Sequence, residues 1–114
     1  MTWFGRWRDD HETDEAPELP DNAKRLHLRF VGQVQGVGFR WTSSLVARDL
    51  GLTGWVRNES DGSVTAEIQG EESHVGAFFP RMLDEYRHHP IRYVVSEREE
   101  IPLVRDERRF EVRY

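Results

Sequence analysis

The segment Val34-Gln35-Gly36-Val37-Gly38-Phe39-Arg40 carries the residues best suited to chemistry. Glycines at positions 36 and 38 allow the backbone to take positive φ, and successive amide N–H groups of such a loop converge on an anion. Arg40 follows where the loop is predicted to enter a helix, whose N-terminus offers unpaired donors and a partial positive charge. Because a guanidinium adds bidentate, charge-assisted bonds, the segment predicts a site for phosphate or carboxylate.

Regular patterns flank this loop on both sides. Leu26, Leu28 and Phe30 alternate with polar residues and predict a strand that runs into the loop. Apolar residues at positions 41, 45, 46 and 50 recur at helical spacing, and Gly51 is expected to cap that helix. We expect the hydroxyls of residues 43 and 44 to serve its first turn, and Trp41 and Trp55 to pack in or near the core.

Two further strands and a second helix follow along the chain. Asp61-Gly62 stands between runs 53–58 and 63–69, which predicts a β-hairpin. The second helix is predicted from apolar residues at helical spacing: Val75, Phe78, Phe79, Met82 and Tyr86. Pro80 falls within it, and we expect a kink or a late helix start because proline removes a backbone hydrogen bond. Residues 91–97 and the alternation at 110, 112 and 114 predict extended segments.

The resulting order is βαββαβ, with room for one extra strand in the last quarter. Each β-α-β crossover is right-handed, so both helices are expected on one face of the sheet. The simplest closure is an α+β ferredoxin-like sandwich, with two helices on one face of a mostly antiparallel sheet. In that arrangement the glycine loop and the strand that carries Asn58 can lie near one another.

Charge divides the chain into two parts. Residues 1–21 hold seven acidic and two basic residues, which account for the whole formal net charge of −5. We interpret residues 1–23 as a flexible acidic N-terminal extension and residues 24–114 as one small domain, since 114 residues with 37% hydrophobic content support one small core. The remainder is neutral, which gives no electrostatic argument for binding to nucleic acid or to an anionic membrane.

Composition excludes several classes of site. The absence of cysteine rules out disulfides, thiolate catalysis and cysteine zinc sites. The five histidines lack a metal-ligand constellation, so neither a metal nor a cofactor is expected. No stretch has the length of a transmembrane helix, and the N-terminus lacks the apolar run of a signal peptide, which favours a cytoplasmic protein. We expect a monomer.

Two separated motifs resemble those of the acylphosphatase family. The first is the Val34–Arg40 loop, and the second is Gly51-Leu52-Thr53-Gly54-Trp55-Val56-Arg57-Asn58, followed by Asp61-Gly62. They stand in the family's order and spacing, and the resemblance covers roughly residues 24–114. It implies a ferredoxin-like fold and hydrolysis of acyl phosphates, without a metal, to a carboxylate and inorganic phosphate.

The resemblance also implies a role for each site residue. Backbone N–H groups of Gln35, Gly36, Val37, Gly38 and Phe39 would bind the phosphate. Arg40 would clamp it, and Asn58 would hold the attacking water through its side-chain amide. Since a carboxylate is a good leaving group and phosphoryl transfer passes through a loose transition state, no strong general base is required.

Some positions depart from the family pattern, and two other functions stay open. Gln33 stands where a basic residue is more usual, and His88-His89-Pro90 replaces a common Gly-Pro. One alternative is a non-catalytic accessory domain that binds acyl or carbamoyl phosphate, because similar domains occur within larger carbamoyl-phosphate-processing maturation factors. The other is an RNA-binding ferredoxin-like module, although the order of aromatic and basic residues is wrong for one and the domain is neutral.

Overall fold

One five-stranded sheet organises the molecule, with the strand order β4-β1-β3-β2-β5. The computed structural model describes residues 18–36, 38–87 and 91–114. The strands are β1 (Ala23–Gly32), β2 (Thr53–Asn58), β3 (Val64–Glu71), β4 (Tyr93–Ile101) and β5 (Phe110–Arg113). All neighbouring strands run antiparallel except β2 and β5, which run parallel. The fifth strand fills the place that the sequence pattern left open in the last quarter of the chain.

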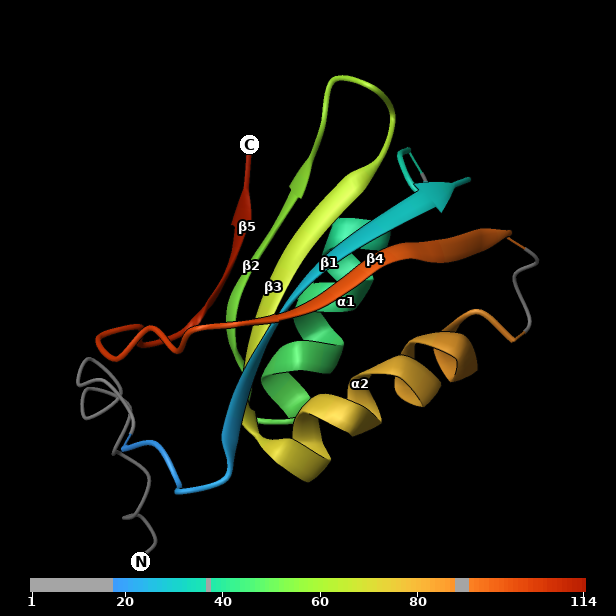
Figure 1. The fold of residues 1–114 in the computed structure, drawn as a ribbon. Coiled ribbons are helices and arrows are strands. Elements are labelled where there is room, and N and C mark those ends of the chain that lie inside the picture. The colour runs from blue at the N-terminus through green and yellow to red at the C-terminus, as the bar shows by residue number, and fades with distance from the viewer. Residues whose placement is uncertain (1–17, 37, 88–90) are drawn as a thin grey trace, which may run out of the picture.

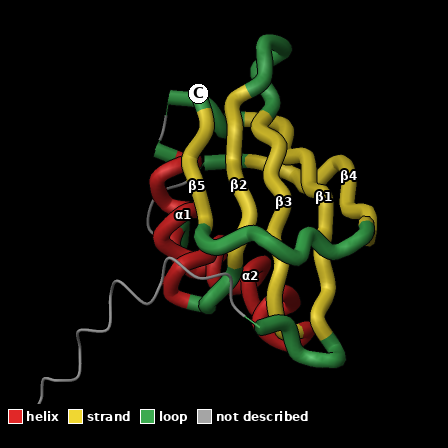
Figure 2. The backbone as a smooth tube through the Cα atoms, turned by 90° about the vertical axis from the view of Figure 1, so that its left-hand side faces the viewer, coloured by secondary structure: helices red, strands yellow, loops and turns green. Residues whose placement is uncertain are grey.

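Two helices, α1 (Phe39–Asp49) and α2 (Glu72–Glu85), cover one face of this sheet (Figures 1 and 2). The α+β ferredoxin-like prediction is therefore confirmed. The start of α2 is fixed by Glu71, whose side chain accepts a hydrogen bond from the Ser73 backbone N–H. That bond and the Ser73 hydroxyl lower the pKa of Glu71 to about 2, so this carboxylate stays charged beside the positive end of the helix dipole.

The core lies between the sheet and the helices. In β1, Leu26, Leu28 and Phe30 are buried while His27 and Arg29 stay half-exposed, which confirms the predicted alternation. From the helices, Val46, Ala47, Val75, Phe78 and Met82 meet these strands in one apolar cluster. The glycine loop therefore emerges from a strand and enters a helix that are both anchored in the same core.

The opposite face of the sheet is crossed by the connection from β4 to β5, residues 102–109 (Figure 2). Arg25 lies beneath it, only 2% exposed, and its guanidinium donates to Glu107 and Glu67. Burial opposes its charge, but the hydrogen bonds and charges of the two glutamates prevail and raise the pKa of Arg25. The Gln69 side chain also bonds the backbone of Val104 in both directions, so the crossing segment is held in place.

The two helices differ from the sequence predictions at Trp41 and at the start of α2. Trp41 was expected in or near the core, and this is wrong, because Trp41 is 62% exposed, whereas Trp55 is buried. Helix α1 instead buries Val46, Ala47 and the small Ser43 and Ser44, whose hydroxyls donate to carbonyls one turn back. A late start of α2 is also wrong, since that helix begins eight residues before Pro80. The kink at Pro80 stays a prediction.

Strand β1 begins at Ala23, one residue before the predicted domain boundary, while residues 1–17 and His88-His89-Pro90 lie outside the described residues. The acidic extension therefore stays a prediction.

Among the described helices, none is long and apolar enough to span a membrane.

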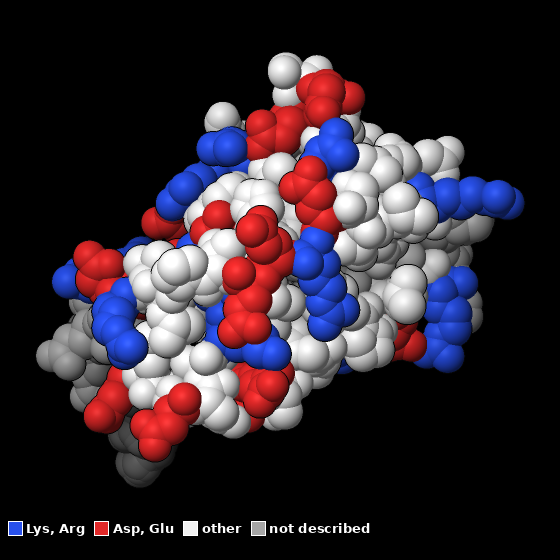
Figure 3. Space-filling model, in the orientation of Figure 1, with Lys and Arg blue, Asp and Glu red and all other residues white. Residues whose placement is uncertain are grey.

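Surface charge is mixed on the face of the molecule drawn in Figure 3. Acidic and basic side chains are interspersed there, with no gathered basic patch. This face gives no support to the RNA-binding alternative, which needs a continuous cationic surface.

Gly54 in β2 provides a test of how closely β2 and β3 approach. Its φ is +140°, and a Cβ there would lie 1.8 Å from the Glu67 carbonyl oxygen. We expect Gly54→Ala to lower the free energy of unfolding by about 2 kcal/mol or more, because backbone must move to relieve the clash. Urea unfolding measures this change.

Gly76→Ala is the matched control. Gly76 lies within α2, and a Cβ there would meet no atom within 4 Å. This substitution should raise the free energy of unfolding by about 1 kcal/mol, because alanine is the better helix former. Equal effects of the two substitutions would contradict the close approach at Gly54.

Candidate active site

The glycine loop joins β1 to α1 and leaves the N-terminus of α1 open. Gly36 and Gly38 have φ of +78° and +75°, and a Cβ at either position would meet no atom within 4 Å. The glycines are therefore required by backbone conformation and not by lack of space. Gly38 is the N-cap of α1 and makes no side-chain cap, so the first amides of the helix are left available to a ligand.

Two glutamines tie the loop to the sheet. Gln35 Nε2 donates to the backbone carbonyls of Glu59 (2.8 Å) and Ser63 (2.9 Å) in the turn between β2 and β3. Gln33, one of the departures from the family pattern, exchanges hydrogen bonds with the backbone of Arg92 before β4. The loop is therefore anchored on both sides, and the Gln35 side chain acts as a tether.

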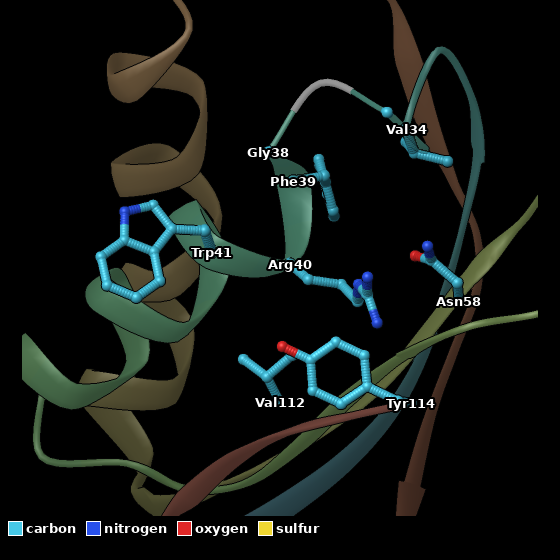
Figure 4. Close-up of a pocket in the computed structure, with 9 residues that line it drawn as sticks. Val34, Gly38, Phe39, Arg40, Trp41, Asn58, Val112 and Tyr114 are labelled. Atoms are coloured by element: carbon cyan, nitrogen blue, oxygen red, sulfur yellow. The ribbon is translucent and has the colours of Figure 1, made fainter.

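Arg40 lies on the first turn of α1, and the end of β5 holds its guanidinium. Nη1 donates to the Arg113 carbonyl at 3.0 Å, and Cζ lies 4.6 Å from the centroid of the Tyr114 ring. A guanidinium has five N–H donors, so most of them stay available to an anion. In Figure 4 the side chain extends from α1 toward Asn58, with the Tyr114 ring beside it.

Asn58 is the last residue of β2 and faces the same pocket as Arg40 (Figure 4). Its Oδ1 atom is buried and accepts no hydrogen bond from any described residue. A buried amide oxygen without a partner is costly, and such groups are commonly satisfied by water or by a ligand. Asn58 is therefore suited to hold a polar molecule against Arg40.

Nine of the described residues line the pocket, whose volume is about 220 Å³. They are Val34, Gly36, Gly38, Phe39, Arg40, Trp41, Asn58, Val112 and Tyr114. Arg40 is the one charged residue among these nine, so an anion entering the pocket meets one cation, the loop and an uncharged wall.

The Phe39 side chain belongs to the core and not to the pocket's polar surface. It is 1% exposed, and its ring packs against those of Phe30, Tyr86 and Tyr93 at centroid distances between 5.0 and 6.0 Å. Burial raises the pKa of both tyrosines, which keeps this aromatic cluster uncharged. Phe39 can contribute its backbone to the site while its ring fixes the start of α1.

Glu59 is the acidic neighbour of Asn58, and it is already engaged. Its carboxylate accepts hydrogen bonds from the Thr65 hydroxyl and from Arg57, and these bonds lower the pKa of Glu59. A carboxylate held in this way is a weak proton acceptor near neutral pH. Glu59 is therefore poorly suited to act as a general base for this pocket.

The structure brings together most of the residues that the motifs predicted. Gly36, Gly38, Phe39, Arg40 and Asn58 line one pocket, whereas Gln35 does not line it, and Val37 lies outside the described residues. Sequence reasoning missed Val34, Trp41, Val112 and Tyr114 as lining residues. The alternation of the final strand was visible in the sequence, but its parallel pairing with β2, which brings it to Arg40, was not.

Comparison with known proteins agrees with this geometry. The family model described as acylphosphatase matches residues 26–112. The chain belongs to the acylphosphatase family. The predicted resemblance is thereby confirmed over most of the domain, and it includes both motifs that meet at the pocket.

Individual acylphosphatases match over different lengths. The chain is 40% identical to an acylphosphatase of Oceanobacillus iheyensis over 94 residues, which are 80% of this chain and 99% of that one. It is 58% identical to an acylphosphatase of Thermococcus kodakarensis over 53 residues, so the matched stretch spans just over half of that relative, 58%. The structure of an acylphosphatase from Coxiella burnetii is similar with a TM-score of 0.65 and 35% identity, covering 81% of this chain and 94% of that one.

The contact between Arg40 and Tyr114 leads to a prediction about anion affinity. We expect Tyr114→Leu to weaken binding of inorganic phosphate about two- to fivefold, because Arg40 loses the aromatic face that orients it. Tyr114→Phe keeps the ring and should bind phosphate as the native chain does. Titration calorimetry compares the three proteins, and equal losses in both variants would show that the ring face does not hold Arg40.

Proposed function

We propose that this chain hydrolyses acyl phosphates to a carboxylate and inorganic phosphate. The observation that carries the proposal is the convergence of Arg40, Asn58 and the open glycine loop on one pocket. Membership of the acylphosphatase family supports it, as do relatives and solved structures that bear the same name. The substrate is a small molecule that presents a phosphoryl group to this pocket.

The phosphoryl group would bind at the loop. Backbone N–H groups between Gln35 and Phe39 would donate to its oxygens, with Arg40 adding charge-assisted bonds from the first turn of α1. The hydrogen bonds of Gln33, Gln35 and Arg40 support this role, because they would hold the described donors in place before substrate arrives. Preorganised donors stabilise the charge that develops in the transition state without a cost of reorganisation.

Asn58 would orient the attacking water. The water oxygen forms a new bond to phosphorus while the bond from phosphorus to the acyl oxygen breaks, and the carboxylate leaves with the electron pair. A phosphoryl oxygen of the substrate accepts the proton of the water. No side chain is needed as a general base, in keeping with a pocket whose described lining holds no acidic residue.

Phosphate release from acetyl, benzoyl and carbamoyl phosphate, measured with a chelator present, tests this proposal. We expect turnover of acyl phosphates that resists the chelator, and none of simple phosphate monoesters. Asn58→Ala should reduce kcat about 10²- to 10³-fold, because one preorganised group is lost. Arg40→Lys should reduce kcat/KM severely, since an ammonium cannot form the bidentate fork.

Circular dichroism and urea unfolding test whether both variants are folded. If the native chain is folded but shows no turnover, this result would contradict the proposed hydrolysis and support the non-catalytic accessory domain. Salt-dependent binding of single-stranded RNA that survives Asn58→Ala would support the RNA-binding module instead.

The pH dependence separates this mechanism from acid-base hydrolysis. Arginine and asparagine side chains do not titrate near neutrality, and the hydrogen bonds of Glu59 keep that neighbour ionised. We expect kcat to be nearly constant from about pH 5.5 to about pH 7.5. A bell-shaped profile with enzyme-derived limbs in this range would point to a general acid and a general base.

We further propose that the protein acts as a cytoplasmic monomer and needs no cofactor. Size-exclusion chromatography with light scattering tests the monomer, and the chelator arm of the assay tests independence from metals.

A further inference from the structure

Helix α2 and the edge strand β4 flank an apolar hollow of about 160 Å³, away from the pocket at the start of α1. Apolar and aromatic side chains line it, among them Phe79 and Leu83 from α2 and Tyr93 and Val95 from β4. Leu83 is 64% exposed and Val95 is 37% exposed, so the hollow opens to solvent. Apolar surface of this kind on a globular domain commonly marks a place where another apolar group binds.

A second hollow continues from the first toward the start of β1. Charged residues of both signs line it, among them Lys24, Glu72, Arg98 and Glu100. The two hollows meet where the Arg98 guanidinium lies 4.3 Å from the centroid of the Phe79 ring, because Arg98 lines one and Phe79 the other. Together they form one groove, here called the α2–β4 groove, which is apolar near Leu83 and charged near Lys24.

The part of the chain that precedes the described residues carries side chains in a matching order. Residues 3–7 hold three aromatic side chains, residues 9–15 hold five acidic ones, and the chain then enters β1 at Ala23. Ala23 pairs with Glu71, directly before α2, so β1 begins at the charged end of the groove. A segment that runs back from Ala23 along the groove would bring its acidic part to the charged hollow and its aromatic part to the apolar one.

The chain is long enough to reach the apolar hollow. Sixteen residue steps separate Trp7 from Ala23, and they span at most about 55 Å when fully extended. Phe30, which lines the hollow, lies seven steps along β1 from Ala23, or about 23 Å. Trp7 can therefore reach the hollow without full extension of the chain. The hollow also has room for one aromatic ring, since a cavity of about 150 Å³ holds benzene.

We propose that the α2–β4 groove binds the aromatic segment, residues 3–7, of the same chain, with an aromatic side chain in the apolar hollow. This inference does not depend on the proposed hydrolysis. A ring bound there covers the exposed side chains of Leu83 and Val95. It also contacts Tyr93, whose ring packs against Phe39 at a centroid distance of 5.3 Å, and so supports the aromatic cluster that fixes the start of α1.

Paramagnetic broadening of NMR signals, measured in the full chain, tests the proposal. The sequence holds no cysteine, so Thr2→Cys provides a single attachment site for a nitroxide beside the aromatic segment. We expect the methyl signals of Leu83 and Val95 to lose most of their intensity relative to the same chain with the nitroxide reduced. The methyl signals of Val104, in the connection that crosses the opposite face of the sheet, should keep their intensity.

Two variants of the labelled chain remove the contact from either side. Replacement of the three aromatic residues of the segment by serine removes the rings, and Leu83→Asp places a carboxylate at the mouth of the hollow. Each should restore the intensity of the Val95 signals. Leu45→Asp is the matched control, because Leu45 is also exposed, at 46%, but lies on α1 and lines neither hollow, so the broadening should remain. Unchanged amide shifts in β2 and β3 check that each variant is folded.

A mixing experiment separates binding within one chain from binding between two copies. A nitroxide-labelled chain without isotopes is mixed with an isotope-labelled chain without nitroxide, and Leu83 and Val95 should then keep their intensity. Broadening of these signals in the mixture as strong as in the single labelled chain would assign the groove to a second copy and overturn the proposal. Absent broadening, equal broadening of Val104, or broadening that survives both variants would also overturn it.

Discussion

The parallel pairing of β2 with β5 is the constraint on which the pocket depends. Its register sets Gly54 opposite Phe110 and Arg57 opposite Arg113, so Tyr114, one residue beyond the last pair, lies at the end of β2. Asn58 stands at that end, and Tyr114 reaches the guanidinium of Arg40 from the neighbouring strand. A shift of one residue in this pairing would turn the Tyr114 side chain to the other face of the sheet, because side chains alternate along a strand. The site is thus assembled by sheet register as much as by the loop motif.

Parallel strands cannot be joined by a tight turn, so the chain must cross the sheet before β5 begins. It crosses the face opposite the helices, and there it passes over the buried guanidinium of Arg25. A buried ion pair contributes little net stability, since the cost of desolvation offsets the attraction, but a broken one leaves an expensive unpaired charge. Any other path of the crossing segment that left Arg25 without Glu107 would therefore be unfavourable. In this way a charge far from the pocket helps to fix the strand that orients Arg40.

The sequence was most informative where structure is local. The alternation in β1, the glycine loop and the Asp61-Gly62 turn are each set by neighbouring residues, and their predictions were confirmed by β1, the N-cap of α1 and the β2–β3 hairpin. Arg40 and Asn58 could be named because both sit in motifs. Trp41 was misplaced because helical periodicity marks one apolar stripe without showing where the stripe ends, and small serines fill the buried positions of α1. Tyr114 was missed because its role comes from a pairing between strands whose partner residues are 56 positions apart in the chain.

The loop, the start of α1 and Arg40 are each anchored to the rest of the fold, and the proposed reaction relies on this anchoring because it uses few polar groups. Gln33 and Gln35 bind the two sides of the loop to the sheet, the Phe39 ring anchors the start of α1 in the core, and the end of β5 holds Arg40. In the proposed mechanism, donors held in this way would lose little entropy on binding an anion, and their interaction energy would be available to the transition state. Asn58 differs from these anchored residues, because its buried Oδ1 atom accepts no hydrogen bond from any described residue. A buried amide oxygen with no partner among the described residues is suited to bind a polar molecule that faces Arg40.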